Sequence, residues 1–218
     1  MSSPSQLHDV LVRFFLNRPE LAPLLLSEAL GVAVPSYTEA RIESGDLTDL
    51  IPAEYRADVV VLLIDGKPVL GIVVEVQLKP KKRKRFSWPA YVAGLRAKFE
   101  CPCCLLVVTT DERTARWASE PISVGPGTTF CPFVLGPKGV PVVTDPQRAQ
   151  HFPELAVMSV MAHGHGDVDT AVKLASLAAQ AAQATQTLDS DMQALYLDLI
   201  ETALGEAARK VSPLRSAC

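Results

Sequence analysis

Two carboxylates, Asp58 and Glu75, each stand next to a long apolar segment of the chain. Asp58 precedes Val-Val-Val-Leu-Leu-Ile, and Glu75 follows Val69-Leu-Gly-Ile-Val-Val. A buried charge without a partner is very costly, so each carboxylate needs a counter-charge or a proton. A divalent cation held by both is one solution, because magnesium and manganese prefer oxygen ligands and retain waters for a phosphate substrate. The pair therefore points to a metal-activated water acting on a phosphate.

A dense basic run follows the second carboxylate at once. Its members are Lys81, Lys82, Arg83, Lys84 and Arg85. Residues 79–85 hold six of the 21 Lys and Arg residues, whereas the rest of the chain sets 15 basic against 24 acidic residues. A local basic patch on an acidic body predicts a focused anion site, in which the run grips a nucleic-acid backbone. A solvated loop is the alternative interpretation.

Three polar residues, Glu75, Gln77 and Lys79, alternate at the end of the second apolar segment. On a strand, such residues project from one face. Gln77 would then position the attacking water or the phosphate, and Lys79 would supply a positive charge one step further on. The structural alternative is that Asp58 and Glu75 form ion pairs with Arg56 or Lys79, and that Gln77 is a hydrogen-bonded strand residue.

A hairpin is the element that must position this pair. Segments 56–64 and 69–78 are β-branched and almost continuously apolar, which predicts central strands covered on both faces. The dipeptide Asp65-Gly66 between them is a strong hairpin signal. Antiparallel pairing would set Asp58 and Glu75 side by side near one end of the sheet.

Helices and further strands surround the hairpin. Helices are predicted at 6–17, 20–30, 87–99 and 112–119, and strands at 37–42, 103–109, 130–135 and 140–143. Ser87 is the expected N-cap of the third helix, with Pro89 in its first turn, and Asp111 is the expected N-cap of the fourth. This order predicts an α/β fold with helices packed on a mixed central sheet.

The C-terminal part has a different character. It is rich in Ala and Gln, and the break His163-Gly-His165-Gly166 interrupts it. Its periodicity predicts helices at 153–162, 169–187 and 188–211. We therefore expect a core at 1–152 and a helical extension at 153–218. The extension packs on the core or on a second copy, which would make a homodimer.

Composition limits the cellular setting and the kinds of site. Five cysteines, three of them within 101–104, do not match a secreted disulfide framework, and no second ligand pair lies at zinc spacing nearby. No apolar run reaches the roughly 18 residues of a membrane span, and the start of the chain lacks a signal peptide. A cytoplasmic protein without a membrane partner is expected.

Other conspicuous side chains have simple interpretations. Trp88 and Tyr91 could stack on bases, but aromatic residues at helical spacing are more often part of a core. His163 and His165 are read as part of an inter-helix loop, and His8 has no partner evident in the sequence.

Asp58, the motif Glu75-Val-Gln77 and a following helix with Tyr91 and Arg96 resemble the PD-(D/E)xK nuclease superfamily. The similarity is to the branch of recombination-promoting and transposase-associated nucleases, where Glu-x-Gln stands in place of Glu-x-Lys. It covers about residues 5–145, and the segment Tyr196-Leu-Asp-Leu-Ile is similar to a helix that follows the core in that branch.

This resemblance implies a restriction-endonuclease-like core and a magnesium-dependent DNA endonuclease. Asp58 and Glu75 would bind Mg²⁺ or Mn²⁺, and Gln77 would replace the lysine that helps to activate water, with Lys79 as a substitute. An upstream glutamate often assists, and Glu28 and Glu43 are both candidates.

Two other functions remain open. Gln77 is neither a cation nor a base, which favours a catalytically inactive nuclease fold that acts as a binding or assembly module. A nuclease that acts on RNA is the third hypothesis, since no groove-reading element distinguishes the two nucleic acids.

Overall fold

The computed structural model describes residues 4–43, 56–125, 128–185 and 188–212. The chain divides into two compact units, residues 2–139 and residues 140–218. The division falls before α5 (Pro146–His151), whereas the sequence placed its boundary after that helix, between residues 152 and 153.

A five-stranded mixed sheet forms the centre of the first unit, in the order β1-β2-β3-β4-β7. Its strands are β1 (Glu39–Glu43), β2 (Val59–Asp65), β3 (Lys67–Val76), β4 (Cys103–Val108) and β7 (Phe133–Leu135). The first three pair antiparallel, whereas β4 runs parallel to both β3 and β7. The predicted α/β fold with a mixed central sheet is confirmed.

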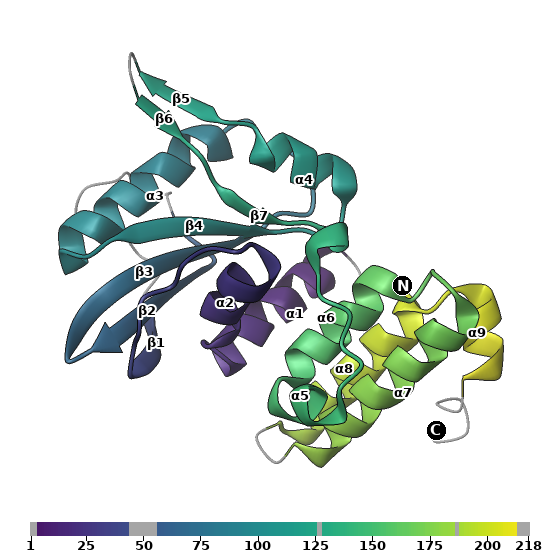
Figure 1. Cartoon of the computed structure of the whole chain (residues 1–218). Helices are drawn as coiled ribbons and strands as arrows, with labels where there is room; N and C mark the ends of the chain where they lie inside the picture. Colours follow the sequence, from purple (N-terminus) through teal and green to yellow (C-terminus); the bar gives the residue numbers. More distant parts are fainter. Residues whose placement is uncertain (1–3, 44–55, 126–127, 186–187, 213–218) are drawn as a thin grey trace. The chain divides into compact units, whose positions relative to one another are not determined.

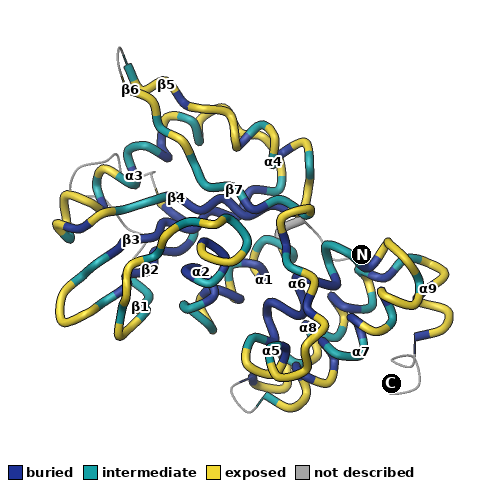
Figure 2. Tube along the Cα trace, in the orientation of Figure 1, coloured by how far each residue is buried: buried dark blue, intermediate teal, exposed yellow. Residues whose placement is uncertain are grey.

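The predicted hairpin joins β2 to β3. Asp65 pairs with Lys67 across the turn, and Gly66 between them has a φ of +66°, which favours glycine because it lacks a Cβ atom. Both strands lie inside the sheet, so their apolar side chains are buried over most of their length (Figure 2). A continuous apolar run is the expected pattern for strands covered on both faces.

Helices cover both faces of this sheet. They are α1 (Pro4–Asn17), α2 (Leu21–Leu24) with the π-helical turn η1 (Leu25–Ala29), α3 (Lys84–Phe99) and α4 (Glu112–Ser119). Helices α1 and α2 lie against one face, and α3 and α4 lie against the other (Figure 1). Asp111 caps α4 as predicted, accepting a hydrogen bond from the Thr114 N–H at 2.7 Å.

The core under α3 uses one stripe of that helix. Trp88, Tyr91 and Leu95 recur at helical spacing and pack on Val60 and Val73 of the sheet. Both aromatic residues are buried, so their interpretation as core side chains is confirmed.

Helix α3 begins earlier than the sequence indicated. Its first residue is Lys84, not a residue after a Ser87 cap, and Pro89 therefore lies inside the helix. Proline lacks the N–H that would bond to the carbonyl of Arg85, and this lost hydrogen bond is the reason that proline is usually expected in the first turn of a helix. Contacts made by Lys84 and Arg85, described below, stabilise the additional turn.

The segment after α4 forms a two-stranded hairpin of β5 (Ile122–Gly125) and β6 (Thr128–Phe130), separate from the main sheet, before β7. A 3-10 turn, η2 (Pro137–Gly139), ends the first unit. The predicted strand at 140–143 is wrong, because these residues are described without strand pairing.

The second unit is helical, as predicted. It contains α5, α6 (Pro153–His163), α7 (Val168–Ala184), α8 (Ser190–Ala203) and α9 (Glu206–Val211). Helix α6 is buried from Pro153 to Val160, and His163 at its end contacts the Val140 carbonyl oxygen at 2.8 Å. Across the described ranges, no helix combines the length and apolarity that crossing a membrane requires.

Candidate functional site

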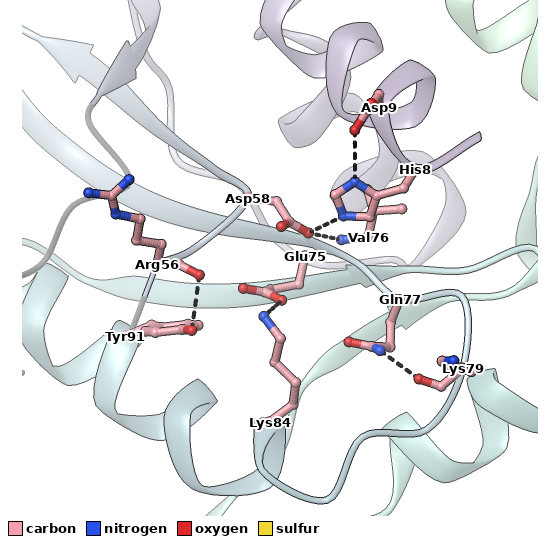
Figure 3. Close-up of polar contacts among 10 residues, drawn as sticks. All are labelled: His8, Asp9, Arg56, Asp58, Glu75, Val76, Gln77, Lys79, Lys84 and Tyr91. Atoms are coloured by element: carbon pink, nitrogen blue, oxygen red, sulfur yellow. Dashed lines mark hydrogen bonds and ion pairs between the residues drawn. The ribbon is translucent and has the colours of Figure 1, made fainter. Parts of the chain in front are cut away.

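The two carboxylates meet at one edge of the sheet. Val59 pairs with Val74, so the next position along places Asp58 opposite Glu75, where β2 begins and β3 ends. The N–H of Val76 donates a hydrogen bond of 2.7 Å to Asp58 Oδ2 (Figure 3). Asp58 keeps 18% of its side chain exposed, so this edge is open to solvent on the side of Asp58.

Glu75 is fully buried, and a lysine from α3 reaches it. The Nζ atom of Lys84 lies 2.5 Å from Glu75 Oε2, and the exposed fractions of the two side chains are 20% and 0% (Figure 3). Side chains lean towards the N-terminus of a helix, so the first residue of α3 extends towards the strand end. Lys84 lies on the same face of α3 as Trp88 and Tyr91. This helical spacing predicts a position towards the sheet, but only if the helix is taken to begin at Lys84.

One oxygen of Glu75 remains unsatisfied. Oε1 is buried and has no hydrogen-bond partner among the described residues, and the same holds for the indole Nε1 of Trp88. The indole N–H faces the carboxylate and helps to lower the pKa of Glu75, but the two atoms do not form a hydrogen bond of good geometry. A buried polar atom without a hydrogen-bond partner lowers the stability of a fold by about 1–3 kcal/mol. A further donor or a cation beside this oxygen would remove that cost.

The pKa of Glu75 is shifted far from its ordinary value. Burial, followed by repulsion from Asp58, raises the pKa of Glu75 to about 7, although Lys84 acts in the opposite direction. The positive charge of Lys84 is therefore too little to hold the carboxylate in its charged form with an ordinary pKa.

Lys84 is fixed from several sides. Burial lowers its pKa, but the attraction of Glu75 outweighs burial, and the net pKa of Lys84 is raised. Its ammonium lies 5.6 Å from the ring centroid of Tyr91, whose hydroxyl donates to the Arg56 carbonyl at 3.0 Å. The lysine is thus held as a cation beside the carboxylate pair.

His8 of α1 is a member of the site that the sequence interpretation missed. Its Nε2 atom lies 3.4 Å from Asp58 Oδ2, and its Nδ1 atom lies 3.5 Å from Asp9 Oδ1 (Figure 3). The signal was its helical spacing from Leu11 and Phe15, which are buried and place His8 on the inward side of α1.

Strand β3 ends at Val76, and the N–H of Gln77 still donates to the Val108 carbonyl at 2.9 Å, so Lys79 lies beyond the strand. Gln77 is buried, and its Nε2 donates to the carbonyl of Lys79 at 2.5 Å, which closes the loop on itself. The side chain of Lys79 is exposed. The prediction that Lys79 follows Glu75 along one face is therefore wrong, and the structural alternative that Glu75 pairs with Lys79 is wrong as well, because its partner is Lys84.

The basic run divides into two groups. Lys81, Lys82 and Arg83 are exposed in the turn before α3. Arg85 instead bonds to the end of α4, with Nη2 2.8 Å from the Pro121 carbonyl and Nη1 3.2 Å from the Trp117 carbonyl. The run is therefore not one continuous phosphate-gripping loop, because Lys84 and Arg85 are engaged within the fold.

The two candidates for the assisting glutamate lie on different elements. Glu43 ends β1 opposite Val60 and forms an ion pair of 2.6 Å with Arg41. Glu28 is exposed on η1. Neither position decides between them, and the assisting role stays a prediction for both.

The donor set fits a hard divalent cation only in part. No three His, Cys, Asp or Glu side chains gather as a metal site within the described ranges. Asp58 and Glu75 nevertheless offer two carboxylates, one of them with an unsatisfied buried oxygen. Magnesium is often bound by one or two carboxylates and keeps several waters, so these two carboxylates are the protein ligands that it would use here.

Comparison of the chain with protein families, with curated proteins and with solved structures finds no match.

Proposed function

We propose that this chain is a metal-dependent nuclease of the PD-(D/E)xK type that hydrolyses phosphodiester bonds in DNA. The observation that carries the proposal is the opposed pair Asp58 and Glu75, with Lys84 bonded to the buried carboxylate. Burial, followed by repulsion from Asp58, raises the pKa of Glu75 to about 7 although Lys84 is bonded to it, and a bound cation would favour the charged form.

In this proposal Asp58 and Glu75 hold Mg²⁺ or Mn²⁺. The ion would lower the pKa of a bound water and offset negative charge on the phosphate. His8 fixes the orientation of Asp58 through their 3.4 Å contact. The Val76 N–H fixes the same carboxylate from the sheet.

Lys84 takes the role that the motif assigns to a lysine at the position of Gln77. It is an ammonium within hydrogen-bond distance of the carboxylate pair, and it reaches the pair from helix α3 instead of the strand. There it would orient the attacking water or bind a phosphate oxygen. Gln77 instead stabilises the loop that leads to α3.

The substrate backbone would lie along Lys81, Lys82 and Arg83, which are exposed before the same helix. Contacts of this kind go to phosphates and carry no base preference, so they fit DNA and RNA alike. DNA remains the proposed substrate because the resemblance points to it, and RNA is retained as a test substrate. The homodimer through the C-terminal helices also stays a proposal.

The test compares cleavage of plasmid DNA, single-stranded DNA and RNA in Mg²⁺ and in Mn²⁺. Asp58→Asn and Glu75→Gln should abolish cleavage and weaken metal binding measured by calorimetry. Asp65→Asn is the matched control, because this exposed aspartate lies at the other end of β2. Failure of the unmodified protein to cleave any of these substrates would contradict the proposal.

A non-catalytic binding module is the second candidate. The observation that favours it is that Glu75 is fully buried and already ion-paired with Lys84. In that case calorimetry should detect no Mg²⁺ or Mn²⁺ binding, and Asp58→Asn should leave nucleic-acid affinity unchanged.

A further inference from the structure

An aromatic side chain is presented to solvent in the first turn of α3. Phe86 is 76% exposed, the largest exposed fraction among the large hydrophobic side chains that the structure describes. The other aromatic residues at this end of the helix, Trp88 and Tyr91, are buried. Burying a phenylalanine side chain stabilises a fold or a complex by about 1.5–3 kcal/mol. The exposed Phe86 makes no such contribution to the stability of this fold.

Exposed basic residues precede the first turn of α3 along the chain. We call residues 79–83 the basic turn; all five are exposed, and four are basic. The ammonium groups of Lys81 and Lys82 have no ion-pair partner within the described ranges. No acidic residue occurs between Glu75 and Glu100, so no carboxylate close in the sequence offsets the charge of these two lysines. An exposed aromatic side chain close in the sequence to exposed lysines is a combination found where proteins bind single-stranded nucleic acid.

We propose that Phe86 stacks on an unpaired base of single-stranded nucleic acid, while Lys81 and Lys82 contact its phosphates. In a duplex the faces of the bases are covered by their neighbours, so an exposed ring finds a free base face only on an unpaired strand. An anionic membrane surface is the less favoured partner. Membrane binding scales with buried apolar area, and Phe86 is the only exposed large hydrophobic side chain described in α3.

Helix geometry determines which step of the reaction Phe86 affects. Successive residues turn by about 100° and rise by about 1.5 Å, so Phe86 points away from the side on which Lys84 faces Glu75. The stacked base would belong to a flanking nucleotide and not to the one whose phosphate reaches Asp58 and Glu75. This placement rests on the proposed nuclease function, and it predicts that Phe86 contributes to binding and to KM and leaves kcat unchanged.

The test measures the Kd of a fluorescent oligothymidylate of about 20 nucleotides by anisotropy, with the full chain in EDTA, so that no cleavage occurs. Phe86→Ala should weaken binding about 5- to 150-fold, the range for loss of one base–aromatic stack. Phe86→Trp should retain the affinity, because the larger ring also stacks. Val124→Ala is the matched control, since Val124 is an exposed apolar residue on β5.

A strand that lacks bases separates stacking from charge. An abasic oligonucleotide should bind more weakly, and Phe86→Ala should weaken it no further. The double variant Lys81→Ala/Lys82→Ala should reduce the slope of log K against log salt by about 1.4 for a single strand, because two phosphate contacts are lost.

Equal affinity of the unmodified protein and Phe86→Ala for oligothymidylate would overturn the inference. So would equal losses on the normal and the abasic strand, or tighter binding to anionic lipid vesicles than to oligothymidylate with Phe86 required for the vesicles. Because binding is measured without a divalent cation, a lack of nuclease activity bears on the proposed function alone. If the unmodified protein cleaves DNA but Phe86→Ala changes neither binding nor KM, this inference is contradicted and the proposed function is not.

Discussion

Glu75→Gln should change how the stability of the protein depends on pH. In the native protein the pKa of Glu75 is raised from 4.5 to about 7, mainly by burial. The native state therefore holds this proton more tightly than the unfolded state, and stability falls as pH rises through that interval. Below pH 4.5 both states are protonated, and the penalty disappears.

The size of the effect follows from the two pKa values. The linkage relation gives a contribution of Glu75 that becomes about 2.5 kcal/mol less favourable between pH 5 and pH 8. Glutamine has nearly the same shape and does not titrate. The free energy of unfolding of the unmodified protein, minus that of Glu75→Gln, should therefore fall by about 2.5 kcal/mol across this range.

Urea denaturation in EDTA measures this difference, and tryptophan fluorescence reports it. Trp88 is buried and its ring lies 5.5 Å from that of Trp117, so the emission should change on unfolding. Asp65→Asn, with an exposed side chain on the same hairpin, should give a flat difference over the same pH range. A flat difference for Glu75→Gln as well would refute the placement of Glu75 as a carboxylate with a raised pKa.

Lys84→Met extends the same prediction. Lys84 lowers the pKa of Glu75, so its removal should raise that pKa beyond about 7 and lower stability most at alkaline pH. Lys67→Met, at the exposed start of β3, is the control for loss of a lysine. Greater loss of stability at pH 5 than at pH 8 would contradict this assignment.

The remaining predictions concern positions around the site. Gly71→Ala should lower the free energy of unfolding by about 1–3 kcal/mol, because a Cβ atom would lie 2.7 Å from Cys103 Sγ and 2.8 Å from Leu95 Cδ2; urea denaturation measures this, and unchanged stability would contradict it. Tyr91→Phe should cost about 1 kcal/mol in the same assay through loss of the hydrogen bond to the Arg56 carbonyl. His8→Ala should weaken Mn²⁺ binding about 10-fold or more in calorimetry, because Asp58 loses the side chain that orients it; unchanged affinity would remove His8 from the site.

The arrangement of the strands could be predicted from the sequence because it depends on local patterns. Apolar runs at 56–64 and 69–78 with Asp65-Gly66 between them leave few alternatives to a buried hairpin. The observed register places Asp58 opposite Glu75 as expected. Asp111 was likewise readable, since an N-cap is a property of adjacent residues.

Contacts formed through loops could not be predicted in this way. The periodic argument for Lys79 failed because β3 ends at Val76, and a side chain beyond a strand end no longer follows its alternation. Lys84 reaches Glu75 only because α3 starts four residues before Trp88, which would be the first helical residue after a Ser87 cap. Arg85 stabilises that start by bonding to carbonyls at the end of α4, a tertiary interaction that overrides local capping preferences. His8 was missed for a similar reason, since its partner lies on a different element.

The proposed metal site depends on what the Lys84–Glu75 pair leaves unsatisfied. A hydrogen-bonded cation favours the charged form of a carboxyl and lowers its pKa, whereas burial and a neighbouring carboxylate raise it. Here the pKa of Glu75 is raised to about 7 despite Lys84, and Oε1 has no hydrogen-bond partner in the part of the chain that the structure describes. Asp58, Glu75 and Lys84 together carry one negative charge when all are ionised, which would repel a phosphate. A divalent cation would reverse that sign, satisfy the unpartnered oxygen and make the site attractive to a nucleic-acid backbone.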